Sequence, residues 1–367
     1  MNTNLTPASD VRAYMLRPKD QTFGTLSELR SACQYDRDHS HEASYSWKDL
    51  QVVPSPDGQA VLLQSPRRAA QFTHWSFGQL CRSVGAPASY VSTLPPENIA
   101  RDLTFGLGRT APASDAKILV RANGGSPIVR ACTSETYGRL WDADWTGALQ
   151  DSLASMGNGW EVTIATRSDR DTYVTLSNKR SVLEDPSTKA IVNDPSADVG
   201  GIMYRSLTIG NSEVGAGSVW YQAGIYRARC KNLMLWSCSV DGTFRRRHVG
   251  EKVFRDTMRA IFHLARRYAE QSPENDQRLI RLLIDRQIAE TKAGVVDELK
   301  ALGATKEQAI EAYERCELTE QASPRSFWGL AQGLTRLSQD REYQNERIQL
   351  DQLAGKLLSR GQRLVAA

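Results

Sequence analysis

The feature that most constrains the fold is a change in hydrophobic period near residue 251. From 116 to 250, short runs of alternating apolar and polar residues are separated by turn-forming residues, a pattern typical of antiparallel strands. One stretch inside this region, 146–157, has a helical period and ends at a glycine. Beyond 251 the apolar residues recur at helical spacing. Strands followed by helices favour an α+β fold: an antiparallel β-sheet core with an embedded helix, followed by a C-terminal helical region.

The residues before this core form two further parts. Residues 1–45 are polar, and we expect an N-terminal segment that is partly flexible. Residues 46–115 combine a strand hairpin with a small helical insert, which Pro87, Pro95 and Pro96 break into short helices. The predicted organisation is an N-terminal segment at 1–45, a strand hairpin with a helical subdomain at 46–115, a β-rich core domain at 116–250 and a helical region at 251–367.

Composition excludes several classes of protein. Hydrophobic residues make up 40% and charged residues 24%, which are globular values. No run approaches the roughly 18 apolar residues of a membrane span, and the first residues lack the pattern of a secretory signal. The six cysteines have no C-x₂-C spacing, which favours reduced, buried thiols over disulfides or zinc ligation. We therefore expect a cytoplasmic protein with no cofactor, no bound metal and no membrane partner.

Positive charge is concentrated in the middle of the chain. Residues 225–268 contain eleven Lys and Arg against three Asp and Glu, a local net charge of +8 in a chain whose total is +4. Such an excess is typical of a surface that contacts a polyanion. The candidate phosphate-binding residues are Arg227, Arg229, Lys231, Arg245, Arg246, Arg247 and Lys252, and the candidate base-stacking residues are Tyr226, Trp220 and Trp236.

Strand alternation sharpens this hypothesis. In an extended segment, Arg227, Arg229 and Lys231 point to one face of the sheet, where three cations can follow a sugar–phosphate backbone. An ordinary solvated sheet face with some ion pairs explains the same pattern equally well. Arg245, Arg246 and Arg247 tip the balance, because they precede a predicted helix, where positive charge opposes the helix dipole. We expect the surplus cations to gather on one continuous surface.

A metal-dependent nuclease is the alternative from another class. Its carboxylates would be Glu213 with Asp142 or Asp144, and His248 is a conceivable base. The simpler interpretation is that Glu213 stabilises a glycine-rich turn and that the two aspartates are charged loop residues. A third possibility is an assembly or host-interaction protein, in which the basic strip meets an acidic protein.

Four motifs together resemble a phage- and plasmid-associated family catalogued as domain of unknown function 932. They are R-A-x-x-S-x-x-Y at 130–137, N-S-E-V-G-x-x-S at 211–218, R-x-x-C-x-N-x-M at 227–234 and R-H-x-G at 247–250. Leu233 departs from the family pattern, which has glycine there. The resemblance implies a mobile genetic element and a bacterial cytosol. More remotely, the expected sheet with a basic groove is similar to ring-forming single-strand annealing recombinases.

These observations predict a non-catalytic nucleic-acid-binding protein. Its expected ligand is single-stranded DNA, with RNA also open, and it would anneal strands in recombination or replication. A homo-oligomeric ring or filament would let neighbouring subunits share one strand.

Overall fold

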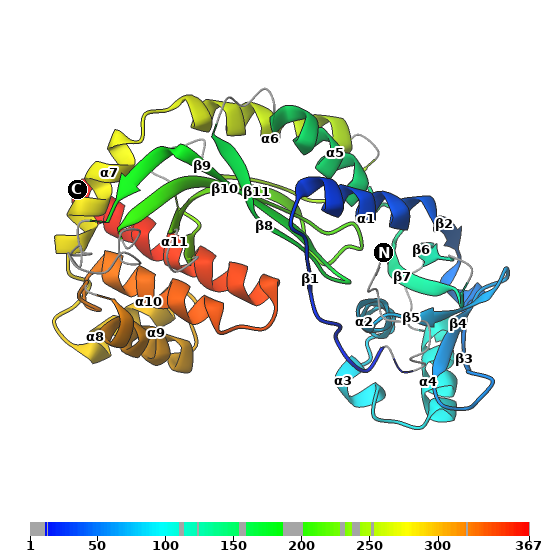
Figure 1. Ribbon diagram of the computed structural model, residues 1–367. Coiled ribbons are helices and arrows are strands. Elements are labelled where there is room, and N and C mark those ends of the chain that lie inside the picture. The colour runs from blue at the N-terminus through cyan, green and yellow to red at the C-terminus, as the bar shows by residue number, and fades with distance from the viewer. Residues whose placement is uncertain are drawn as a thin grey trace.

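The computed structural model describes residues 12, 14–109, 114–122, 125–153, 159–185, 201–227, 232–236, 243–250, 253–320 and 322–366. Two β-sheets organise the described chain, and helices cover both (Figure 1). Sheet A is a curled antiparallel arch, and sheet B lies beside it together with three helices of its own. The α+β fold predicted from the change in hydrophobic period is confirmed.

Sheet A contains most of the strands predicted in the β-rich region. Its strands are β1 (Gln21–Thr22), β8 (Trp160–Arg167), β9 (Thr172–Glu184), β10 (Ile202–Asn211), β11 (Val219–Arg227), β12 (Asn232–Met234) and β13 (Thr243–Arg246). The order is β1-β8-β9-β10-β11-β12, and β13 also pairs with β11. All pairings are antiparallel, and Trp220 on β11 lies opposite Gly210 on β10 and Arg245 on β13.

Three helices cover the outer face of sheet A. They are α1 (Leu26–Asp38), α5 (Asp142–Leu153) and α6 (Val253–Glu270). Val219, Tyr221 and Ala223, on one face of β11, are buried in a single cluster with apolar side chains of these helices. Helix α5 is the embedded helix expected from the sequence, and it begins at Asp142. The residues predicted to be a charged loop therefore form its first turn, where carboxylates complement the helix dipole.

A helical bundle encloses the far end of the arch (Figure 1). Its helices are α7 (Glu274–Asp285), α8 (Lys292–Ala301), α9 (Lys306–Thr319), α10 (Phe327–Gln339) and α11 (Gln344–Ala366). Helix α10 is almost entirely buried at the centre. Sheet residues Leu183, Met203 and Ile225 join its apolar core. Helix α11 runs beneath the inner face of sheet A, where Ile348 packs against Tyr226.

Sheet B is smaller and takes strands from both sides of the expected boundary at residue 115. Its strands are β2 (Ser40–Tyr45), β3 (Gln51–Pro54), β4 (Val61–Gln64), β5 (Ala69–Phe72), β6 (Ala116–Arg121) and β7 (Ile128–Ser134). Strand β7 pairs in parallel with β5, which draws β6 and β7 away from the strands of sheet A. Helices α2 (His74–Ser83), α3 (Ala88–Val91) and α4 (Pro96–Arg109) share its core, and a short 3₁₀ turn spans Trp47–Asp49.

The prediction that the cysteines are buried is confirmed where the structure describes them. Cys33, Cys81, Cys132 and Cys316 are buried free thiols, and burial raises the pKa of each. Cys230 and Cys238 lie outside the described residues. Within the described chain, no helix combines the length and apolar character required to cross a membrane.

Candidate functional site

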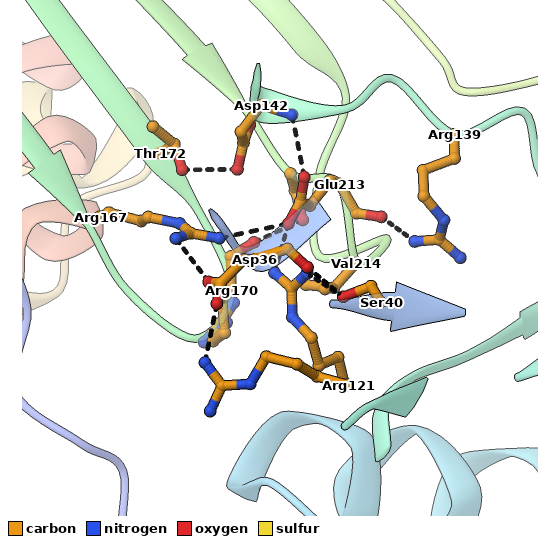
Figure 2. Close-up of polar contacts among 12 residues, drawn as sticks. Asp36, Ser40, Arg121, Arg139, Asp142, Arg167, Arg170, Thr172, Glu213 and Val214 are labelled. Carbon is orange, nitrogen blue, oxygen red and sulfur yellow. Dashed lines mark hydrogen bonds and ion pairs between the residues drawn. The ribbon is translucent and has the colours of Figure 1, made fainter. Parts of the chain in front are cut away.

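Glu213 is the centre of a buried ionic network between the two sheets (Figure 2). It follows the end of β10, and its side chain is 4% exposed. One carboxylate oxygen accepts hydrogen bonds from Arg130 on β7 and, at 3.3 Å, from Arg167 on β8. The other oxygen accepts from the backbone N–H of Asp142 at 2.9 Å. Burial would raise the pKa of Glu213, but the Arg130 and Arg167 guanidiniums outweigh it and the pKa is lowered.

A second carboxylate extends the network toward α1. Asp36 accepts from Arg121 at 2.7 Å and pairs with Arg167 at 2.6 Å. Although burial opposes ionisation, Arg167, Arg130 and Arg121 lower the pKa of Asp36 to about 2. The Arg167 guanidinium is therefore held between the carboxylates of Asp36 and Glu213, inside the protein.

The nuclease alternative requires Glu213 and Asp142 to converge, and they do lie side by side. However, Asp142 accepts 2.7 Å hydrogen bonds from Trp145 and Asn211 on one oxygen and from Thr172 on the other. Burial and the neighbouring Glu213 raise the pKa of Asp142 to about 6. Both carboxylates are thus occupied by donors of the protein itself.

Asp144 does not complete a metal site with them. It turns away and pairs with Arg37 on α1. Among the described residues, no group of three or more His, Cys, Asp and Glu is arranged to hold a metal ion. The geometry is that of a structural network, since the expected catalytic carboxylates serve as internal partners for arginines.

The N-S-E-V-G motif explains why these groups meet. Asn211 binds Asp142, and Ser212 donates to the backbone carbonyl of Arg170 at 2.6 Å. The carbonyl of Val214 accepts from Trp75 and Gln79, both on α2. Gly215 has φ +81°, which favours glycine and supports the interpretation of this stretch as a turn. Asn211, Glu213 and Val214 therefore join the end of β10 to α5, β7 and α2, respectively.

His248 is a buried packing residue. Its ring stacks on Tyr137 with centroids 5.3 Å apart, and its Nδ1 lies 3.3 Å from the carbonyl oxygen of Gly138. Burial, with a smaller contribution from the positive charge of Arg139, lowers the pKa of His248 to about 4. The hydrogen bond with Gly138 acts in the opposite direction but is outweighed. No nucleophile or carboxylate among the described residues hydrogen-bonds it, and nothing in its contacts supports a catalytic base.

The prediction that Arg227 contacts a phosphate on the protein surface is wrong. Arg227 is 4% exposed and forms a 2.6 Å ion pair with Glu320, a 2.7 Å hydrogen bond with Gln332 and a 3.3 Å ion pair with Asp185. Strand alternation correctly placed Arg227 on the same sheet face as Ile225. The helical bundle covers that face, so solvent does not reach Arg227. Arg229, Lys231 and Lys252 lie outside the described residues.

The three consecutive arginines at the end of β13 do not share one direction. Arg245 lies opposite Trp220 and lines a groove, whereas Arg246 lies opposite Val219 and approaches Asp256 of α6 at 4.0 Å. Arg247 is exposed beyond the strand. The surplus cations are therefore divided between the interior, the groove and the outer side of α6. The expectation of one continuous basic surface is not met in the described chain.

The groove that Arg245 lines is the strongest candidate binding site. It has a volume of about 630 Å³ and lies between the inner face of sheet A and α11. Gln352, Lys356, Ser359 and Arg363 line its other wall. Of the lining residues that the structure describes, three are cationic and none is acidic. Arg245, Lys356 and Arg363 form no ion pair with any carboxylate in the described part of the chain.

Sequence reasoning missed the α11 wall. Its four residues recur at i, i+4, i+7 and i+11, which places them on one stripe of a helix. That spacing is visible in the sequence, but two cations among two uncharged polar residues resemble any solvated helix face. The stripe becomes a groove wall because Gly355 lets α11 closely approach the backbone that directly follows β12. A Cβ at Gly355 would lie 1.9 Å from the carbonyl oxygen of Leu235.

The three candidate stacking aromatics occupy different positions. Trp220 is half-buried on the groove wall, packed over Gly210 and 6.1 Å from the ring of Tyr173. Trp236 is 2% exposed and forms part of the groove floor, so it has little free face for a base. Tyr226 lies on the same inner face but in a separate cleft. Only Trp220 among them combines exposure with a place beside the groove cations.

Comparisons with known proteins add no constraint: no family model, curated protein or solved structure matches this chain. The resemblance to the phage- and plasmid-associated family thus stays a prediction. The structure nevertheless shows how three of the four motifs meet. Arg130 binds Glu213, Tyr137 donates to Ser212, and His248 stacks on Tyr137.

Proposed function

We propose that this protein binds single-stranded nucleic acid in the groove between sheet A and α11. The observation that carries the proposal is the combination of Arg245, Lys356 and Arg363 around one cavity with no acidic residue described in its lining. Phosphates would take the place of the carboxylates that these cations lack. Lys356 and Arg363 are seven residues apart on one helix, about 10 Å along its axis. This separation suits two phosphates of an extended strand better than one compact anion.

The preference for a single strand follows from Trp220. Its indole is fixed by packing over Gly210 and beside Tyr173, so little side-chain entropy is lost when a base stacks on it. Stacking on a protein aromatic requires a base whose face is free, which a duplex does not offer. We take single-stranded DNA as the ligand, and a comparison with RNA tests the sugar preference.

The test is a fluorescence-anisotropy titration with labelled single-stranded DNA, duplex DNA and single-stranded RNA from about 50 to about 200 mM salt, where phosphate contacts should matter. Arg245→Ala, Lys356→Ala and Arg363→Ala should each weaken binding. Each should also reduce the salt slope by roughly 0.7, the value for one phosphate contact on a single strand. Arg246→Ala is the matched control, because it removes the same charge from the same strand but faces α6.

Equal losses in Arg245→Ala and Arg246→Ala would sink the proposal, since they would indicate a non-specific charge effect. If nucleic acid neither binds nor co-purifies, the third possibility gains, namely an acidic protein partner in an assembly or host-interaction role. A magnesium- or manganese-dependent cleavage that is lost in Glu213→Gln would instead favour the nuclease. The internal partners of Glu213 oppose that outcome.

The biological setting belongs to the same proposal. The family resemblance suggests a phage or plasmid protein that acts in the bacterial cytosol, in recombination or replication. A homo-oligomeric ring or filament would align the grooves of neighbouring subunits along one strand and promote annealing. Light scattering with and without single-stranded DNA, followed by an annealing assay with complementary strands, tests both steps.

A further inference from the structure

A second cleft, separate from the groove, opens on the inner face of sheet A near the start of α11. It has a volume of about 450 Å³, within the range of small-molecule sites. Sheet residues Thr163, Thr166 and Tyr226 form one side. The segment leading into β1, with Asp20, and the turn between α10 and α11 form the other.

The lining of this cleft is rich in uncharged hydrogen-bonding groups. It contains three threonine hydroxyls, two glutamine amides and one tyrosine. Its charged members are Asp20, Glu342 and Arg347, so carboxylates outnumber cations, the reverse of the groove. A phosphate-bearing ligand would find no surplus of cations in this lining, unlike in the groove. A neutral ligand with several hydroxyls can donate to the carboxylates and accept from the hydroxyl and amide donors.

Two residues of the lining each have a polar side-chain atom that is buried without a hydrogen-bond partner among the described residues. Thr166 is 6% exposed, and its Oγ1 has no partner. Asp20 Oδ1 also has none, and its nearest cation, Arg17, is 3.6 Å away. By contrast, Thr163 already donates to the carbonyl of Thr175 at 3.1 Å. Unmet buried polar atoms are costly, so a hydroxyl-bearing ligand gains by satisfying them.

The acidic wall of the cleft is held in place before any ligand binds. Asp20 Oδ2 accepts from the backbone N–H of Gln344 at 2.6 Å. Arg17 donates to Asn345 at 2.6 Å and lies over the ring of Tyr343, 3.6 Å from its centroid. These contacts tie the segment before β1 to the first turn of α11. A preorganised wall lowers the entropy lost when a ligand binds.

We propose that this cleft binds a neutral polyhydroxylated ligand, a sugar either free or as the glycosyl part of a nucleoside, with Thr166 and Asp20 as hydrogen-bonding partners. The site is distinct from the groove and does not depend on nucleic-acid binding. Glu342, which is exposed at the rim, supplies a further acceptor.

The test is isothermal titration calorimetry of the full chain with ribose, glucose and uridine, and with inorganic phosphate as the anionic comparison. Thr166→Val keeps the side-chain shape and removes only the unmet hydroxyl. It should weaken sugar binding roughly 3- to 10-fold, the loss of one neutral hydrogen bond. It should leave the Tm unchanged or raised, because no internal bond is lost. Thr319→Val, on the exposed end of α9, is the control.

Binding of ribose or glucose that weakens in Thr166→Val supports a free sugar, and binding of uridine alone supports a nucleoside. The proposal is overturned if none of these compounds binds, if phosphate binds in their place, or if Thr166→Val leaves affinity unchanged. A fall in the Tm of Thr166→Val would show that the hydroxyl has an internal partner, which removes the premise.

Discussion

Arg130 on β7 and Glu213 beyond β10 form a buried ion pair that joins the two sheets of the protein. Neither residue is more than 5% exposed in its side chain, and Arg167 and the backbone of Asp142 complete the coordination of the carboxylate. Both sheets contribute residues to the network around this pair. The pair therefore couples the stability of sheet A to that of sheet B.

Breaking this pair should destabilise the protein strongly. Arg130→Met leaves Glu213 with one fewer cation in the interior, and we expect a loss of about 3 to 5 kcal/mol in the free energy of unfolding. Urea denaturation measures it. Arg101→Ala, which disrupts an exposed pair with Asp102, is the control and should leave stability nearly unchanged. A similar small change in Arg130→Met would contradict a structural role for the network.

Arg227 and Arg245 should separate stability from binding. Arg227→Met removes a buried cation that pairs with Asp185 and Glu320, so it should cost about 3 to 5 kcal/mol in unfolding free energy. Once folded, it should bind single-stranded DNA with unchanged affinity. Arg245→Ala should show the reverse, with weaker binding and unchanged stability. Measuring both quantities for both variants checks this, and a large affinity loss in stable Arg227→Met would contradict the burial of that side chain.

Gly210 should matter through Trp220. A Cβ at position 210 would lie 2.5 Å from the Trp220 ring, so Gly210→Ala must displace the indole. We expect a cost of roughly 1 to 3 kcal/mol from overpacking and a weaker interaction with single-stranded DNA. Gly58→Ala is a useful comparison, because its Cβ meets no atom within 4 Å; its positive φ strains the backbone without touching the groove. Unchanged DNA affinity in Gly210→Ala would argue against stacking on Trp220.

His248 gives a pH dependence whose sign is defined. Its pKa is lowered in the folded state, from 6.5 to about 4, chiefly by burial. Its contribution to stability is therefore complete above about pH 6.5 and declines as the pH falls toward 4, because only the unfolded chain takes up the proton. The loss approaches about 3 kcal/mol.

Asp142 acts in the opposite direction, since its raised pKa removes stability as the pH rises from 3.8 through about 6. The contribution of His248 must therefore be isolated with a variant. The difference in unfolding free energy between the wild type and His248→Asn should shrink between pH 7 and pH 5. A constant difference across that interval would show that His248 titrates normally in the folded protein.

The sequence by itself determined the elements of local origin. Alternation defined β8 to β11, helical spacing defined the C-terminal region, and the glycines of 210–217 indicated a turn that Gly215 does form. These features depend on neighbours along the chain, so a one-dimensional pattern contains them. Even the buried stripe of α6 follows from spacing alone, with Met258, Ile261 and Ala265 against the sheet.

Tertiary structure decided which polar residues meet. The pattern could place Arg227 on one face of a strand, but only the bundle shows that Glu320 and Gln332 cover that face. It could not bring Lys356 to Arg245, more than a hundred residues away, or turn Glu213 from a loop acid into the partner of Arg130. Charge carries no information about distant partners, because an arginine destined for solvent and one destined for a buried carboxylate look alike until the chain folds back on itself.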